Sequence, residues 1–217
     1  MATEPILDLA TLLAPIDGAD PAGIDVRLDD SPSSAYYVIK DARSAAREIE
    51  KQIANRPGAA AADGGPTPDP EWRKIRNQAP KLLTSQSKDF EVVMWLTEAL
   101  LRLEGFAVAA LATLLYARSG ASWWLFAALW LVPDLSMLGY LRGPRLGSWC
   151  YNAVHTYIGP IALTAIALGF DHPALVPYAY IWFHHIGLDR LLGYGLKYPH
   201  GFAQTHLKAL PQSLKQL

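Results

Sequence analysis

Apolar residues follow a helical repeat through much of the first hundred residues. Three stripes with steps of three and four residues predict three helices, because residues at this spacing share one helix face. The members of the stripes are Ile39, Ala42, Ala46, Ile49 and Ile53; Trp72, Ile75, Ala79 and Leu82; and Val93, Leu96, Leu100 and Leu103. Ser87 and Asp89 are good residues for the start of the third helix. Pro80 is expected to bend or shorten the second helix.

Turn-forming residues precede and separate these helices. Residues 14–34 are acidic and rich in Pro, Gly, Asp and Ser, which predicts an extended entry segment. The stretch RPGAAAADGGPTPDP, residues 56–70, indicates a flexible loop. The first hundred residues are therefore expected to form a small all-α unit, and no cluster of catalytic side chains is visible in them.

The pattern changes after residue 105, where long apolar segments dominate. Residues 122–141, 148–170 and 174–196 each supply about the 20 residues needed to cross a bilayer. Three tryptophans lie near segment ends, where interfacial aromatic residues are enriched: Trp123, Trp124 and Trp149. The alternative, three buried helices of a soluble protein, leaves too little polar surface for a unit of this size. The pattern therefore predicts a membrane domain.

The apolar stretch from Phe106 to Ala117 is shorter, at 12 residues or about 18 Å. It can cross a hydrocarbon core of about 30 Å only if the span begins near Leu100. Arg102 would then snorkel to the headgroups, and Glu104 would need an internal partner. The sequence thus predicts one helix that leaves the first unit and enters the membrane. Gly105 lies inside that helix, and Gly105→Ala is expected to be tolerated.

The predicted fold class is all-α, with a small soluble helical domain followed by a four-helix transmembrane bundle. The expected domains are residues 1–104 and 105–207, with a short cytoplasmic tail at residues 208–217.

Up to Gly105 the chain has 12 Lys and Arg against 17 Asp and Glu, and the remainder has 7 against 3. The formal charges of −5 and +4 are hidden by the total of −1. The sequence has no cluster of basic residues that would indicate binding to nucleic acid. Its single Cys excludes an internal disulfide.

Basic residues near the span ends set the expected orientation. The N-terminal side, the loop at residues 142–147 and the C-terminal tail carry most of them, whereas the other two loops carry only Arg118. The positive-inside rule then places both termini in the cytoplasm, with the lipid bilayer as the first partner. The N-terminus is acidic and lacks the basic start of a signal peptide, so no signal peptide is expected.

Polar and ionisable side chains interrupt the apolar segments, and such residues are costly in a membrane. With the spans given above, they fall at one depth in the cytoplasmic third of the bilayer. The members of this polar belt are Glu104, Asp134, Asn152, His155, His185 and Asp189. Asn152 and His155 are three residues apart, and His185 and Asp189 are four apart, so each pair shares a helix face. His184 points elsewhere.

Three interpretations of the polar belt remain open. One is a hydrogen-bonded network that holds the spans together. Another is a zinc or iron site, because imidazole and carboxylate groups from different helices suit these metals, and a metal-activated water could hydrolyse a bond at the membrane surface. The candidate ligands are Asp134, His155, His185 and Asp189. The last is a proton or ion relay. No HExxH motif is present, and no catalytic or cofactor-binding residue is singled out.

The first part of the chain resembles a known family. The stretches LLAPIDGADPAGIDVRLDD and EWRKIRNQAPKLLTSQSKDFEVVMWLTEALLRLEGFA are similar to the N-terminal ImpA/TssA domain of bacterial type VI secretion systems. Pro21, Gly23 and Asp25, followed by Arg27, match the Pro-x-Gly-x-Asp core of that family's entry segment. The resemblance covers about residues 12–107. It implies a cytoplasmic, protein-binding and non-enzymatic module.

The second part resembles the bacterial membrane family called domain of unknown function 4260, over about residues 100–207. The motifs PDLSMLGY, YNAVHTY and IGLDRLLGYGLKYP carry this resemblance, and the polar belt lies largely within them. The resemblance implies a small multi-span membrane protein and no particular reaction. The two resemblances share LLRLEGFA, residues 100–107, without a linker between them.

The sequence therefore predicts a multi-pass protein of the bacterial inner membrane with both termini in the cytoplasm. Its activity is unknown, and its N-terminal domain is expected to dock onto proteins, with type VI secretion proteins as the candidate partners. The alternative is an intramembrane metal-dependent hydrolase that uses the cluster of His and carboxylate side chains.

Overall fold

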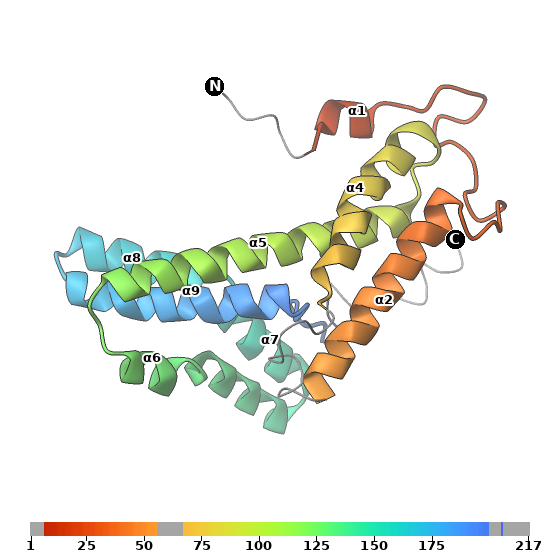
Figure 1. The fold of residues 1–217 in the computed structure, drawn as a ribbon. Coiled ribbons are helices and arrows are strands. Elements are labelled where there is room, and N and C mark those ends of the chain that lie inside the picture. The colour runs from red at the N-terminus through yellow and green to blue at the C-terminus, as the bar shows by residue number, and fades with distance from the viewer. Residues whose placement is uncertain (1–6, 56–66, 200–204, 206–217) are drawn as a thin grey trace. The chain divides into compact units, whose positions relative to one another are not determined.

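The computed structural model describes residues 7–55, 67–199 and 205, and within them it contains helices and two isolated β-bridges. The all-α prediction is confirmed for this part of the chain (Figure 1). The helices in order are α1 (Leu9–Leu13), α2 (Ala35–Asn55), α4 (Asp69–Ser85), α5 (Phe90–Arg118), α6 (Trp123–Leu129), the 3-10 helix η1 (Val132–Arg142), α7 (Pro144–Val154), α8 (Ile158–Gly169), the 3-10 helix η2 (Pro173–Leu175) and α9 (Val176–Leu191). The chain divides into two compact units, residues 1–100 and 101–217.

The apolar core of the first unit lies between α2, α4 and the beginning of α5. The first two predicted stripes supply much of it: Ile39, Ala42, Ala46, Trp72, Ile75, Ala79 and Leu82 are buried. Pro80 lies inside α4, yet the helix continues to Ser85 and is not shortened. A proline removes one helical hydrogen bond, and the buried neighbours Ala79 and Leu82 on the same helix offset that loss by packing.

The buried face of α5 agrees with the predicted stripe only in part. Leu96 is buried and Leu100 is partly buried against the core, as predicted. Trp95 and Ala99 are also buried, whereas Val93 is exposed, and so is Leu103, which lies in the second unit. Apolar residues occur on several sides of α5, so spacing alone does not select the face that meets the core. The predicted stripe is therefore confirmed at Leu96 and Leu100 and wrong at Val93 and Leu103.

The entry segment folds back onto the turn before α5. The Ile24 N–H donates to the Gln86 carbonyl at 2.9 Å, and the Lys88 N–H donates to the Ala22 carbonyl at 2.7 Å. Gly23 lies between these two bonds with a φ of +86°, and a Cβ there would lie 2.1 Å from the Gln86 carbonyl oxygen. Both the backbone conformation and the close approach require glycine at this position.

Arg27 fixes the end of the entry segment that follows Asp25. Its guanidinium donates to Asp89 Oδ2 at 2.7 Å and to Glu91 Oε2 at 3.1 Å, and it lies over the Tyr36 ring at 4.9 Å from the centroid. Asp25 accepts the Arg27 backbone N–H at 3.0 Å, which closes the turn. The Pro-x-Gly-x-Asp segment thus serves the packing of the first unit and fastens the beginning of α5.

Helix α5 continues from Phe90 to Arg118, so the prediction of one continuous helix is confirmed. In the second unit α5 runs alongside α9 (Figure 1), and Gly105 lies at their contact. A Cβ at Gly105 would lie 2.6 Å from the Gly187 carbonyl oxygen and 2.7 Å from Arg190 Cβ. The expectation that Gly105→Ala is tolerated is therefore wrong, because the sequence pattern indicated a helix interior but not a close helix contact.

Two helical segments, Phe90–Arg118 and Trp123–Arg142, are long and apolar enough to cross a membrane. Only 6% of the apolar window in the second is buried within the protein, so most of its side chains are at least partly exposed. The predicted span at residues 148–170 is divided between α7 and α8, since Pro160 fits the first turn of a helix but not its interior. Helix α9 has 16 residues. For the described residues, the four-span arrangement stays a prediction.

Candidate metal centre

Four residues of the predicted polar belt converge in the second unit, on η1, α9 and the end of α7. The Nε2 atoms of His155 and His185 are 3.2 Å apart. Asp134 Oδ1 lies 3.4 Å from the first of these nitrogens and 3.6 Å from the second. Asp189 Oδ2 lies 3.7 Å and 4.0 Å from the same two atoms. Asp134, His155 and His185 each place one donor atom within 4.8 Å of the others.

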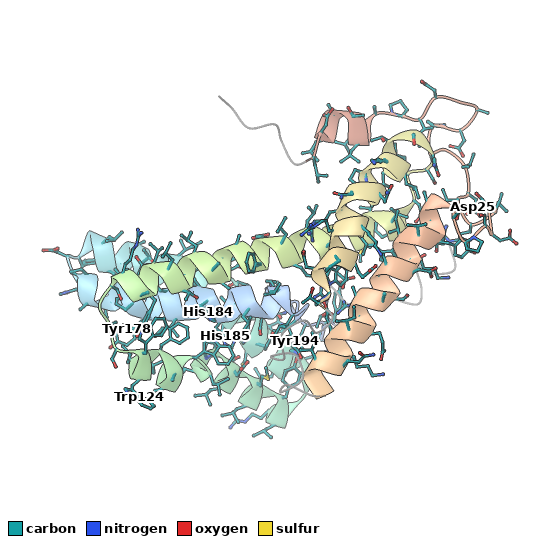
Figure 2. All side chains as sticks on the ribbon, viewed as in Figure 1. Asp25, Trp124, Tyr178, His184, His185 and Tyr194 are labelled. Atoms are coloured by element: carbon teal, nitrogen blue, oxygen red, sulfur yellow. The ribbon has the colours of Figure 1, made fainter. Side chains whose placement is uncertain are left out.

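Each of these side chains is positioned by a helix end or a helix turn. Asp134 lies in the first turn of η1, directly after Pro133, where a proline costs no helical hydrogen bond. His155 is the C-cap of α7. His185 and Asp189 lie one turn apart on α9, on which Figure 2 labels His185. The side chains of His155 and His185 are 0% and 2% exposed, whereas those of Asp134 and Asp189 are 32% and 19% exposed.

A backbone carbonyl sets the tautomer of His155. Its Nδ1 lies 2.9 Å from the Tyr151 carbonyl oxygen, which can only accept, so Nδ1 carries the hydrogen and Nε2 presents a lone pair to the cluster. The Tyr151 ring stacks on the imidazole with 3.7 Å between centroids, and its hydroxyl donates to Asp189 Oδ2 at 3.1 Å. Metal-binding histidines are commonly oriented in this way, by a hydrogen bond from the other ring nitrogen.

Arg190 and Trp130 support the cluster from two other directions. The Arg190 guanidinium donates to the His155 carbonyl at 2.9 Å and to the Tyr194 carbonyl at 2.7 Å. The Trp130 ring meets the His185 ring edge to face, with 5.6 Å between centroids. Sequence reasoning did not assign Tyr151 or Trp130 to the site, because tyrosine and tryptophan carry no metal signal of their own. The four-residue spacing from Tyr151 to His155 was the one available indication.

The other two residues of the polar belt lie apart from this cluster. The Asn152 side chain donates to the Lys197 carbonyl at 2.9 Å and accepts the Lys197 N–H at 2.7 Å, which ties the chain after α9 to α7. Glu104 is exposed on α5. His184 accepts a hydrogen bond from Trp130 Nε1 at 3.0 Å, so its Nδ1 is occupied away from the cluster.

Two family models match the chain, and each covers just over half of its 217 residues. The model described as "ImpA, N-terminal, type VI secretion system" matches residues 13–130. The model described as "Domain of unknown function (DUF4260)" matches residues 98–210, so the two overlap at residues 98–130. No curated protein and no solved structure matches the chain. The chain therefore belongs to both families, to the ImpA N-terminal family through its first part and to the DUF4260 family through its second.

Proposed function

We propose that the chain is a membrane protein whose second unit holds one divalent metal ion between Asp134, His155 and His185. The observation that carries the proposal is the convergence of two imidazole nitrogens and one carboxylate oxygen, with separations of 3.2 to 3.6 Å. Two histidines and one carboxylate are a usual set of protein ligands for zinc.

The hydrogen-bonding capacity of these groups favours a cation over a simple polar network. While His155 is neutral, its Nε2 and the Asp134 carboxylate are both acceptors, so their 3.4 Å contact is not a hydrogen bond. Nε2 of His185 can donate to only one of them. A metal ion accepts all three lone pairs at once.

The spacing of the three donors favours zinc. Donors about 2.0–2.1 Å from a tetrahedral ion lie about 3.3–3.4 Å from one another. Neighbouring donors of an octahedral ion with the same bond length lie only about 2.8–3.0 Å apart. The separations of 3.2, 3.4 and 3.6 Å centre on the tetrahedral value. Iron is the second choice, since two histidines and one carboxylate also bind non-haem iron.

Elemental analysis of the detergent-purified protein tests this proposal. Protein supplied with zinc and then dialysed is expected to retain about one zinc ion per chain. His155→Ala and His185→Ala should lose it. His184→Ala is the matched control, because that neighbouring histidine bonds to Trp130 instead. Circular dichroism of each variant separates loss of ligands from loss of fold, and the absence of zinc from the well-folded wild-type protein would rule the centre out.

The bilayer is proposed as the environment of this unit. Large apolar side chains of the second unit are exposed to an extent that water would penalise: Trp124, Leu141, Trp149 and Ile158 are each at least 74% exposed. We extend this to four spans in the inner membrane, with both termini in the cytoplasm. Reporter fusions at each terminus and in the 142–147 loop test the orientation, and a periplasmic signal from any of the three contradicts it.

The first part of the chain, up to residue 104, is proposed to be a non-enzymatic docking domain for type VI secretion proteins. The support is its membership of the ImpA N-terminal family, whose description names that system. The full chain in detergent should be retained by at least one immobilised type VI secretion component. An Ile39→Asp variant, which places a charge in the core of the first unit, should not be retained. Equal retention of both proteins would contradict a role of this domain.

A further inference from the structure

We propose that the metal centre keeps one open coordination position beside Asp189, and that this position takes an oxygen ligand such as water or a hydroxamic acid. The inference rests on the proposed metal centre. It divides the two carboxylates between two roles. Asp134 binds the ion, and Asp189 stands next to the ion as a hydrogen-bond acceptor for whatever occupies the fourth position.

The distances separate Asp189 from the three ligands. Its Oδ2 lies 3.7 Å from His155 Nε2 and 4.0 Å from His185 Nε2, whereas Asp134 Oδ1 lies 3.4 Å and 3.6 Å from the same atoms, nearer to the value of about 3.3–3.4 Å between donors on tetrahedral zinc. Asp189 Oδ2 accepts the Tyr151 hydroxyl at 3.1 Å, and this bond holds the carboxylate back from the ion.

Exposure indicates from which side a ligand can enter. The two histidines are buried, so they close the site on their side. The side chains of Asp134 and Asp189 remain partly exposed, so the accessible side of the cluster is the one that carries the carboxylates. A ligand that arrives there meets the ion and, beside it, an acceptor oxygen on Asp189.

This arrangement selects the chemistry of the ligand. A group that binds the ion through oxygen and also carries a hydrogen can donate to Asp189 at the same time. Water and hydroxamic acids meet both conditions, whereas a halide ion can bind the metal but has neither the oxygen nor the hydrogen. Structural zinc sites have four protein ligands, and zinc sites that bind and polarise a ligand keep one position free. The inference places this centre in the second class.

Cobalt substitution tests the open position directly. Co²⁺ replaces zinc in such sites, and its visible spectrum reports the ligands around it. The zinc-free protein in detergent is loaded with one equivalent of Co²⁺ and titrated with acetohydroxamic acid. We expect a saturable spectral change with one hydroxamate per metal ion. Asp189→Asn should still bind Co²⁺ within about tenfold of the wild-type affinity, because the lost carboxylate is not a ligand, whereas Asp134→Asn should lose Co²⁺ binding. Glu104→Gln, which removes an exposed carboxylate outside the cluster, is the matched control.

The outcomes distinguish this inference from the metal centre itself. If the wild-type protein binds no Co²⁺ or Zn²⁺, the metal centre and the open position are both wrong. If the wild-type protein binds Co²⁺ and hydroxamate leaves the spectrum unchanged, the metal centre stands and the open position is wrong. Loss of Co²⁺ binding in Asp189→Asn, with a folded protein by circular dichroism, would likewise show a closed site with four protein ligands.

Discussion

Gly105 of α5 and Gly187 of α9 face each other so closely that neither position has room for a side chain. A Cβ at Gly105 would lie 2.6 Å from the Gly187 carbonyl oxygen. A Cβ at Gly187 would lie 2.9 Å from the Gly105 carbonyl oxygen and 2.8 Å from the Ala109 nitrogen. Small residues permit this kind of backbone approach between packed helices.

Replacement of Gly105 by alanine is therefore expected to destabilise the second unit. The added methyl group must push the two helix backbones apart, and overpacking of this kind costs about 1–3 kcal/mol. Thermal unfolding in detergent should show a lower transition temperature for Gly105→Ala. Gly169→Ala is the control, since a Cβ at Gly169 meets nothing within 4 Å. Equal transition temperatures for the two variants would show that α5 and α9 can move apart without loss of stability.

Glu98 is expected to be essential for the stability of the first unit. Its carboxylate is 3% exposed, accepts from Arg43 Nε at 2.9 Å and also pairs with Arg47. Glu98→Gln leaves two arginines facing a neutral group, and loss of one partner from a buried ion pair costs about 3–5 kcal/mol. Glu48→Gln, in an exposed pair with Lys51 at 4.0 Å, should cost about 0–1 kcal/mol. Urea unfolding of the two variants compares these costs, and similar values would mean that Glu98 is well solvated.

Alkaline pH is expected to weaken the first unit through Tyr36. Burial raises the pKa of Tyr36 to about 12, and the hydrogen bond to Glu91 at 2.9 Å acts in the same direction. The unfolded chain has the ordinary value near 10, so the native state binds the phenolic proton more tightly. The resulting stability is complete below pH 10 and is lost as the pH rises towards 12. Unfolding free energies at pH 9 and pH 11.5 should differ by less in Tyr36→Phe than in the wild-type protein. Identical pH dependence in both proteins would assign the alkaline loss to other groups.

Zinc is expected to raise the unfolding temperature of the wild-type protein. A ligand that binds only the native state at one hundred times its Kd adds about 2.7 kcal/mol of stability. A chelator should reverse the increase. His185→Gln should respond to neither zinc nor chelator, because it lacks one of the three proposed ligands. A His185→Gln protein that zinc still stabilises would place the bound ion elsewhere.

Asn152 is expected to hold the chain after α9 in place. Its two hydrogen bonds to the Lys197 backbone contribute about 0.5–1.5 kcal/mol each. Asn152→Ala should therefore speed amide hydrogen exchange in residues 193–198, measured by mass spectrometry. Asn77→Ala, at an exposed position of α4, is the control and should leave this segment unchanged. Unchanged exchange in Asn152→Ala would mean that Arg190 and its bond to Tyr194 suffice.

The sequence allowed a good part of the cluster to be predicted, for a physical reason. Ionisable residues in apolar segments are costly, so Asp134, His155 and His185 stood out without any motif. The position of a residue along the helix axis does not determine, however, which side of the helix its side chain lies on. Glu104 and Asn152 shared the predicted depth and yet lie apart from the cluster.

The helix breaks and contacts were harder to predict. The interruption of the span at residues 148–170 depends on His155 as a C-cap and on Pro160 in the next first turn. Apolar composition does not show such a break, because both halves remain apolar. The contact at Gly105 depends on α9, about eighty residues later in the chain, and local spacing carries no information about that partner.

The winding of η1 has a geometric consequence for its outer surface. A 3-10 helix has about three residues per turn, so residues three apart lie in a straight row. Val132, Leu135, Leu138 and Leu141 form such a row, and all four are exposed, by 47%, 60%, 61% and 84%. With about 3.6 residues per turn, the nine steps from Val132 to Leu141 would make about two and a half turns, and the two side chains would point in opposite directions. The tighter winding therefore places these four apolar side chains on one side of η1 along its whole length. Asp134 lies on a different side of the same helix.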